Sequence, residues 1–236
     1  MDNTSAFNSN TYDENIRKVI PMYDEIYEQI FDLIKTYFGD TSIALLDTGC
    51  GTGSFGYRAR AELNLSDLML CDPSKDMMEC VRKKMLGKKY SSKCVGSQDM
   101  DFKNRFDVVT AIQSHHYFDK HTREKAVMNC FDALKEGGLF ICFENTAPFS
   151  ETGKTILLDR VENFQLGQGR TEEEVKEHRA RYGKEYFPLN IKEHIELLER
   201  AGFKTAEVFW MSYMQCGFYA IKNGERMTYG DLFKFL

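Results

Sequence analysis

Apolar and polar positions alternate in blocks from residue 43 to residue 145. Short, nearly continuous apolar runs are separated by longer segments in which apolar residues recur at helical spacing. A strand buried on both faces is apolar throughout, whereas a helix packed on a sheet carries one apolar stripe. The alternation therefore predicts a parallel sheet with helices on both faces. The expected strands are 43–47, 68–71, 90–95, 106–112 and 139–144. The expected helices are 54–63, 74–86 and 122–135, the last closed by Gly137-Gly138.

The segment before this block predicts helices. Apolar residues recur at helical spacing over residues 11–38, and Pro21 interrupts them, which predicts two short helices. The polar residues 1–10 are expected to be disordered.

After residue 145 the alternation stops. Residues 150–185 predict two charged helices with a break at Gly167-Gln168-Gly169, and residues 190–200 predict a helix with Asn190 as its N-cap. Residues 208–210 and 218–221 predict two strands whose connection is too short for a parallel crossover, hence an antiparallel hairpin. A terminal helix is expected at 226–236.

The length of 236 residues suits one α/β domain. Within it we distinguish N-terminal helices (11–38), a ligand-binding core (43–145), a helical insertion or lid (146–189) and a final helix with hairpin (190–222). The expected fold is a seven-stranded, mostly parallel sheet with a C-terminal antiparallel hairpin, helices on both faces and a helical lid.

Composition and charge narrow the function. The formal net charge of −5 argues against a nucleic-acid partner. The seven cysteines form no C-x-x-C pair, which argues against a metal site and suits a reducing cytoplasm. The N-terminus lacks the basic and apolar regions of a signal peptide, and no apolar run is long enough to span a membrane. We therefore expect a cytoplasmic protein without a membrane partner.

The strongest chemical signal is a glycine-rich turn after the first expected strand. The segment Asp47-Thr48-Gly49-Cys50-Gly51-Thr52-Gly53 lies between that strand and a helix, where glycines allow a sharp turn and close approach of a ligand. Residues 51–56 also satisfy the dinucleotide pattern G-x-G-x-x-G, which alone is weak evidence. Asp47 separates the two readings, because a carboxylate there would repel a pyrophosphate but suit the ammonium group of a methionine moiety. The turn therefore favours S-adenosylmethionine.

Three further segments extend this prediction along the strand ends. Asp72, at the end of the second strand, can accept hydrogen bonds from ribose hydroxyls, a feature that dinucleotide enzymes share. Asp99 can accept from the adenine amino group while Met100 packs on the ring. The turn after the fourth strand can hold the methionine part. The expected cofactor contacts in and beyond the glycine turn are Gly49, Cys50, Gly51, Gly53, Pro73, Ser74, Gln98, Gln113, Ser114 and Tyr117.

Taken in this order, the four elements resemble the class I S-adenosylmethionine-dependent methyltransferases. The resemblance covers residues 43–145 and implies a Rossmann-like methyltransferase fold, which the closing hairpin also suits. Asp47 stands where this family often carries Glu, a change that keeps the carboxylate. The implied product is S-adenosylhomocysteine.

The flanks resemble a narrower group, the carboxy-S-adenosylmethionine synthases and related small-molecule methyltransferases. The similar segments are 15–23 and 171–222. The resemblance implies that Arg17 and Tyr23 lie near the cofactor and that Arg179 stands where the synthases hold a carboxylate. For Tyr23, packing as a helix residue is an equal alternative, and for Arg179 a surface position in a charged helix is the favoured one. Arg179 and Tyr182 are the candidate substrate residues.

The reaction itself suggests candidate catalytic residues. The cofactor carries its own activation, so a base is needed only when the acceptor must lose a proton. His115 and His116 follow the fourth strand and are the candidate bases, although they could instead shape the pocket. Glu144, at the end of the fifth strand, is another residue on the acceptor side. The acceptor pocket is expected between the N-terminal helices and the insertion, whose aromatic residues are Tyr12, Tyr23, Phe149, Phe164, Tyr182, Tyr186 and Phe187.

Four functions remain open from the sequence. They are a methyltransferase for a small-molecule acceptor, a carboxy-S-adenosylmethionine synthase or similar enzyme, an NAD(P)-dependent oxidoreductase, and a binding protein without activity. The sequence identifies neither the acceptor nor the atom that is methylated. Aromatic residues in 209–219 and 229–235 would suit a homodimer surface, although packing in the core would explain them equally.

Overall fold

The computed structural model describes residues 8–222 of the chain, so the helix expected at 226–236 lies outside the described residues. Within this range the strands are β1 (Ile43–Thr48), β2 (Leu65–Cys71), β3 (Ser91–Lys93), β4 (Phe106–Ile112), β5 (Leu134–Asn145), β6 (Thr205–Ser212) and β7 (Gln215–Ile221). The α-helices are α1 (Tyr12–Asn15), α2 (Tyr23–Phe38), α3 (Ser54–Glu62), α4 (Lys75–Lys84), α5 (Lys120–Ala133), α6 (Glu151–Gly167), α7 (Glu172–Ala180) and α8 (Ile191–Arg200). Short 3-10 helices are η1 (Ile16–Lys18), η2 (Ser97–Asp99) and η3 (His115–Tyr117).

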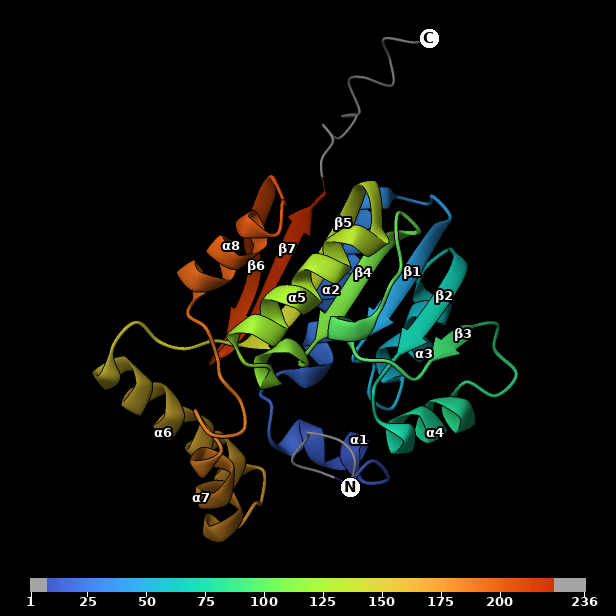
Figure 1. Cartoon of the computed structure of the whole chain (residues 1–236). Coiled ribbons are helices and arrows are strands. Elements are labelled where there is room, and N and C mark those ends of the chain that lie inside the picture. Colours follow the sequence, from blue (N-terminus) through green and yellow to red (C-terminus); the bar gives the residue numbers. More distant parts are fainter. Residues whose placement is uncertain (1–7, 223–236) are drawn as a thin grey trace.

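The seven strands form one sheet in the order β3-β2-β1-β4-β5-β7-β6 (Figure 1). All neighbours from β3 to β5 are parallel, whereas β7 runs antiparallel to both β5 and β6. Only two residues, Tyr213 and Met214, join β6 to β7, and Tyr213 takes a left-handed conformation with φ of 53°. The Rossmann-like fold with a C-terminal antiparallel hairpin is therefore as expected.

Alternate residues of each central strand feed two separate cores, one on each face of the sheet. Leu45 and Leu70 pack against α2, α3 and α4 on one face. Leu46 and Phe140 pack against α5 and α8 on the other face. The helices on both faces are visible in Figure 1. Because both faces are covered, β1 is buried along its whole length.

Two local expectations need correction. The helix expected at 122–135 ends at Ala133, and Gly137 and Gly138 lie inside β5, where the pairing with β4 shifts register. Gly137 has φ of 71°, so the two glycines allow an irregular backbone near the start of β5 and do not end a helix. The N-terminal segment also breaks as Pro21 suggested, but its second helix, α2, is long, with 16 residues.

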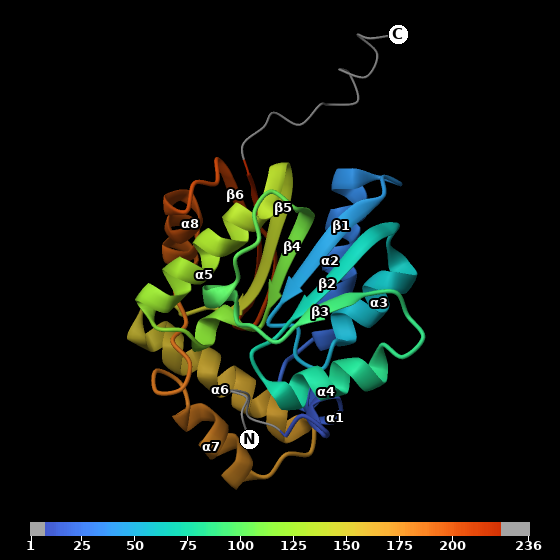
Figure 2. The same ribbon diagram turned by 45° about the vertical axis from the view of Figure 1, so that its right-hand side comes forward.

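The remaining helices gather at one end of the sheet. Figure 2 shows α1, α6 and α7 lying together below the carboxyl ends of the parallel strands. A mixed open sheet of this type places its ligands at that edge. No helix among residues 8–222 is long and apolar enough to cross a membrane.

Candidate functional site

A hollow of about 1030 Å³ opens at the carboxyl ends of β1, β2 and β4. Its walls come from the glycine turn, the starts of α3 and α4, and the turns after β3 and β4. We call it the cofactor pocket. It is lined by Tyr12, Tyr23, Tyr27, Asp47, Gly49, Cys50, Gly51, Thr52, Ser54, Phe55, Asp72, Pro73, Ser74, Met77, Gly96, Ser97, Ile112, Gln113, Ser114, Tyr117 and Phe118. The list contains eleven of the residues expected to contact a cofactor.

The glycine turn has the backbone that only glycine adopts easily. Gly49, Gly51 and Gly53 all have positive φ, at 66°, 54° and 79°. A Cβ on Gly49 would lie 2.5 Å from Cβ of Ser114, so this glycine allows the turns after β1 and β4 to meet. A Cβ on Gly51 would meet nothing within 4 Å, because it would enter the pocket. The conformation of this turn therefore lets a ligand contact the main chain directly.

Asp47 is the charged group at the floor of the pocket. Its side chain is buried and accepts a hydrogen bond of 2.7 Å from Oγ1 of Thr110 on the neighbouring strand. Burial raises the pKa of Asp47 to about 7, with the hydroxyl of Thr110 acting against this and the charge of Asp72 adding to it. A cation in the pocket would restore the ionised form.

The second acidic residue, Asp72, is fixed by the backbone. Its carboxylate accepts hydrogen bonds of 2.9 Å from the backbone N–H of Gly51 and of Ser74. Ser74 in turn caps α4 by accepting from the N–H of Met77. Ser114 lines the pocket, and its buried hydroxyl has no hydrogen-bond partner among residues 8–222. Together these groups provide acceptors and donors around a space of nucleoside size.

Five of the expected cofactor residues lie away from this pocket. Gly53 is the N-cap of α3. Gln98 donates to Asp99, and exposed Asp99 also pairs with Lys125. Met100 is buried in the core beneath α5. After β3 the structure brings Gly96 and Ser97 to the pocket instead.

The fifth is Arg17 of the N-terminal segment. Its guanidinium makes a double contact with the carboxylate of Asp24, at 2.7 and 2.9 Å, and side chains of both residues are about half exposed. Tyr23 does reach the pocket, where its hydroxyl lies 2.7 Å from that of Tyr27. Of the two residues that the resemblance implied, the structure thus brings Tyr23 to the pocket and leaves Arg17 outside it.

The N-terminal segment is tied directly to the glycine turn. Asp13 accepts hydrogen bonds from the hydroxyls of Thr52, at 2.7 Å, and Ser54, at 3.0 Å. Lys84, at the end of α4, contacts the same carboxylate at 2.5 Å. These polar contacts hold Tyr12 against the opening of the pocket, so the segment 11–20 acts as a strap across it.

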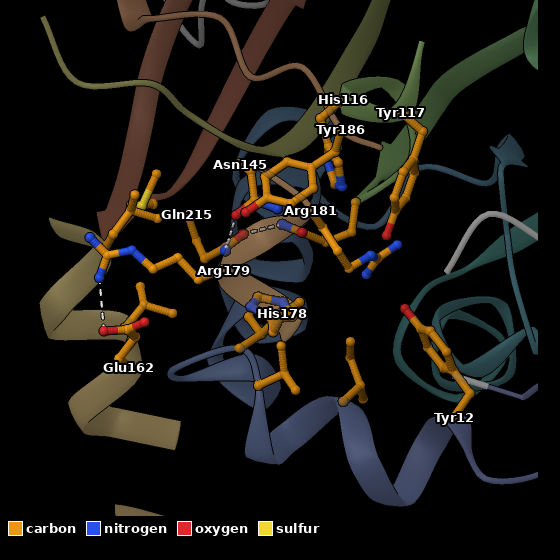
Figure 3. A pocket seen from close by; sticks show the side chains of 17 residues that line it. Tyr12, His116, Tyr117, Asn145, Glu162, His178, Arg179, Arg181, Tyr186 and Gln215 are labelled. Carbon is orange, nitrogen blue, oxygen red and sulfur yellow. Dashed lines mark hydrogen bonds and ion pairs between the residues drawn. The ribbon is translucent and has the colours of Figure 1, made fainter. Parts of the chain in front are cut away.

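A second hollow, of about 690 Å³, adjoins the first (Figure 3). Tyr12, Gln113 and Tyr117 line both hollows, which therefore meet at these side chains. We call the second one the acceptor pocket. Its other lining residues are Ile16, Val19, Ile20, His116, Asn145, Leu158, Val161, Glu162, His178, Arg179, Arg181, Tyr186, Met214 and Gln215. They come from the strap, from α6 and α7, and from the ends of β4, β5 and β7.

The two candidate histidines have different surroundings. His115 is buried beside Ser97 and Phe140, lines neither pocket, and burial lowers its pKa to about 4. His116 lines the acceptor pocket, and its Nδ1 lies 2.6 Å from the carboxylate of Glu144. Burial raises the pKa of Glu144, but the hydrogen bond and charge of His116 outweigh it and bring the pKa to about 2.

This acidic partner fixes the histidine ring. An ionised Glu144 can only accept, so Nδ1 of His116 donates the hydrogen of this contact and Nε2 is the other ring nitrogen. The carboxylate also accepts from the backbone N–H of His115 and of His116. Buried Arg123 holds the same turn from the other side by donating to the carbonyls of His115, His116 and Phe118.

The two expected substrate residues are placed differently. Arg179 lines the acceptor pocket, but its guanidinium is paired with Asp159 at 2.7 Å and Glu162 at 2.8 Å (Figure 3). Tyr182 lines neither pocket and packs against Tyr186 and Lys154 instead. Arg181, two residues after Arg179, points toward Tyr117 and Tyr12 in Figure 3.

Several pocket residues were not singled out by the sequence. Asn145 and Gln215 face each other only because β5 and β7 are antiparallel neighbours, and no local pattern indicates this. His178 of α7 also lines the pocket, and it accepts a hydrogen bond from buried Gln165. Of the aromatic residues expected at the acceptor, Tyr12 and Tyr186 line it, whereas Phe149 is exposed.

Comparisons with known proteins agree with this geometry. Residues 45–138 match a family model described as a methyltransferase domain. Together with the fold, this match supports an S-adenosylmethionine-dependent, methyltransferase-like enzyme. The enzyme accordingly uses S-adenosylmethionine as its cofactor, and the dinucleotide alternative gains no support.

Curated relatives match nearly the whole chain. The carboxy-S-adenosyl-L-methionine synthase of Nautilia profundicola is 23% identical over 201 residues, which is 85% of this chain and 86% of that protein. The synthase of the same name from Staphylococcus epidermidis is 26% identical over 227 residues, or 91% and 93% of the two chains.

Solved structures support the fold. A SAM-dependent methyltransferase from Thermotoga maritima aligns with a TM-score of 0.59 and 16% identity over 91% of this chain and 95% of that chain. The CurJ carbon methyltransferase aligns with a TM-score of 0.67 and 15% identity over 91% of this chain and 58% of that chain.

The residues of the cofactor pocket fit S-adenosylmethionine chemically. Buried Asp47 has one hydrogen-bond donor, Thr110, among the described residues and suits an ammonium group. Asp72 suits ribose hydroxyls, the hydroxyl of Ser114 lacks a partner, and Gly51 leaves open space where a side chain would stand. The described residues contain no group of three or more His, Cys, Asp or Glu side chains arranged to hold a metal ion.

Proposed function

We propose that this enzyme transfers the methyl group of S-adenosylmethionine to a small molecule bound in the acceptor pocket, with His116 as the general base. The observation that carries the proposal is the contact between His116 and Glu144 beside the junction of the two pockets. A histidine held in one tautomer by a buried carboxylate is suited to take a proton from an acceptor. Asp47, Asp72 and the glycine turn are proposed to hold the cofactor.

The cofactor supplies a methyl group activated by its sulfonium, whose C–S electron pair passes to sulfur as the acceptor attacks. The protein residues have the remaining tasks. Nε2 of His116 takes the acceptor's proton, and Glu144 stabilises the imidazolium ion that forms. Tyr12 and Tyr117 stand where the pockets meet, so they orient the acceptor and exclude water.

The proposal is tested with purified enzyme, S-adenosylmethionine and a panel of small hydroxyl, thiol and amine compounds. We expect S-adenosylhomocysteine to form only when an acceptor is present. Replacing His116→Gln should lower kcat/KM for a hydroxyl acceptor by about 10²- to 10⁴-fold and leave the Kd for S-adenosylhomocysteine unchanged. Undiminished turnover in this variant would rule out the assigned base.

A second candidate is a carboxy-S-adenosylmethionine synthase. The curated relatives have that name, and this chain aligns with most of their length. Arg179, the residue assigned to a carboxylate by resemblance, is paired with Asp159 and Glu162, which disfavours this reading. Mass spectrometry of the ligand that co-purifies with the enzyme separates the two. A retained cofactor carrying an extra carboxyl group would favour the synthase.

A further inference from the structure

The charges around the acceptor pocket are compensated within the protein. Its three charged lining residues, Glu162, Arg179 and Arg181, all form ion pairs. Arg179 contacts two carboxylates, and Arg181 contacts Glu185 at 2.6 Å. The two lining arginines thus pair with three carboxylates, those of Asp159, Glu162 and Glu185, while Glu144 lies behind His116 with buried Arg123 near it. An anionic acceptor would therefore meet no net positive charge.

A row of amide side chains forms the polar wall of the pocket. Gln113 donates to Gln215, and Gln215 donates to Asn145 at 2.5 Å (Figure 3). Whichever way the amides are oriented, the row presents neutral donors and acceptors. Gln113 is held in a left-handed backbone conformation with φ of 53°, which only a supporting structure maintains in a residue other than glycine. This wall suits an uncharged polar substituent.

The pocket also has an apolar part of its lining. It consists of Ile16, Val19 and Ile20 from the strap, Leu158 and Val161 from α6, and Met214 from the hairpin. Tyr186 is buried and packs edge-on against His116 with ring centroids 5.8 Å apart. A flat apolar body fits between such walls, because burial of its surface drives binding and aromatic side chains favour ring contacts.

The basic atom of His116 sets the kind of proton that can be removed. A phenolic hydroxyl has a pKa near 10, close enough to that of an imidazole for general-base transfer at neutral pH, whereas an aliphatic hydroxyl is far less acidic. We infer that the acceptor is an uncharged hydroxyarene, bound with its hydroxyl at His116 and its ring between the strap and α6. This inference rests on the proposed function and specifies its substrate class.

The group transfer balances without another reactant. The acceptor O–H bond breaks and its proton goes to Nε2 of His116, while an oxygen electron pair forms the new C–O bond to the methyl group. The C–S electron pair remains on sulfur, so the sulfonium charge is lost and S-adenosylhomocysteine is the product. The proton on His116 then passes to solvent.

Two probes of nearly equal shape test the charge selectivity. Para-ethylphenol and para-hydroxyphenylacetate differ in that a carboxylate replaces a methyl group. Their Kd values are measured by calorimetry on the full chain saturated with S-adenosylhomocysteine at neutral pH. We expect the neutral probe to bind at least about tenfold more tightly. Equal or tighter binding of the carboxylate, or no saturable binding of either probe, overturns the inference.

A variant checks that the ion pairs cause the selectivity. Glu162→Gln removes one of the two carboxylates on Arg179 and should narrow the difference between the probes by improving binding of para-hydroxyphenylacetate. The matched control is Glu172→Gln, which removes an exposed partner of Lys176 on the same lid and should leave both Kd values unchanged. A variant Glu162→Gln with unaltered selectivity would contradict the charge argument.

The same samples separate this inference from the proposed function. If S-adenosylhomocysteine binds but the neutral probe does not, only the acceptor class is wrong. If S-adenosylhomocysteine itself does not bind at millimolar concentration, the proposed function fails.

Discussion

The carboxylate of Glu144 and Nδ1 of His116 lie 2.6 Å apart at the side of the acceptor pocket, and both side chains are almost completely buried. Glu144 comes from the end of β5 and His116 from the turn after β4, so the pair exists only because these strands are neighbours. A buried carboxylate that accepts three hydrogen bonds holds the turn and the ring in one orientation.

Replacing Glu144→Gln should lower kcat by about 10²-fold with a hydroxyl acceptor, because an amide no longer fixes the tautomer or stabilises the imidazolium ion. The Kd for S-adenosylhomocysteine should stay unchanged, since Glu144 does not line the cofactor pocket. Steady-state kinetics and calorimetry measure the two quantities. Glu144→Asp, which keeps the charge, should recover part of the activity; equal loss in both variants would point to a purely structural role.

Cofactor affinity should depend on pH through Asp47. Burial raises the pKa of this carboxyl to about 7, and only its ionised form attracts an ammonium group. The Kd for S-adenosylhomocysteine should therefore increase by up to about tenfold for each pH unit below 7. Calorimetry over this range measures the effect, with Asp47→Asn as the control: it should bind weakly and show a flat profile. A wild-type Kd that does not vary between about pH 5 and pH 8 would contradict the assignment.

The same residue should make the ligand-free protein less stable at alkaline pH. A carboxyl whose pKa is higher in the folded state than its ordinary value of 3.8 favours folding at low pH, and this contribution is lost as the pH rises through about 7. Asp47→Asn stays neutral, so its Tm relative to wild type should rise between about pH 5 and pH 8. Thermal unfolding of both proteins measures this. A constant Tm difference would mean that Asp47 is ionised at all these pH values.

Two glycines of the same turn should respond differently to substitution. Gly49→Ala places a Cβ 2.5 Å from Ser114, so it should lower the free energy of unfolding by more than about 2 kcal/mol. Gly51→Ala meets no protein atom within 4 Å and should cost only about 1 kcal/mol for its positive φ, yet its methyl group enters the cofactor pocket. Denaturant unfolding and calorimetry should show stability lost mainly in the first variant. In Gly51→Ala, the main effect should be a lower affinity for S-adenosylhomocysteine.

The strap should control access to the cofactor. Asp13→Asn removes the charge that pairs with Lys84 and should raise the dissociation rate of S-adenosylhomocysteine by roughly threefold. Hydrogen exchange of residues 12–20 should become faster. The matched control is Glu28→Gln, which removes the ion pair between Glu28 of α2 and Arg58 of α3 and should change neither quantity. Identical exchange in the strap of wild type and Asp13→Asn would contradict this role.

The sequence by itself determined the cofactor pocket in outline. The glycine turn, Asp47 and Asp72 are local features at the ends of buried strands, and a parallel sheet brings such ends to one edge. Hydrophobic periodicity likewise determined the order of strands and helices, because each strand or helix buries its own apolar face. The prediction was less accurate at Gly137-Gly138, where a strand irregularity has the same composition as the end of a helix.

The tertiary structure alone decided the acceptor side. Whether His115 or His116 faces a pocket depends on which of them meets Glu144, and the partners of Arg179 come from another helix. The amide row joins residues more than 60 positions apart in the chain. Such contacts cannot be predicted from local sequence. Ion pairs and hydrogen bonds between distant segments form only where the folded sheet brings those segments close together.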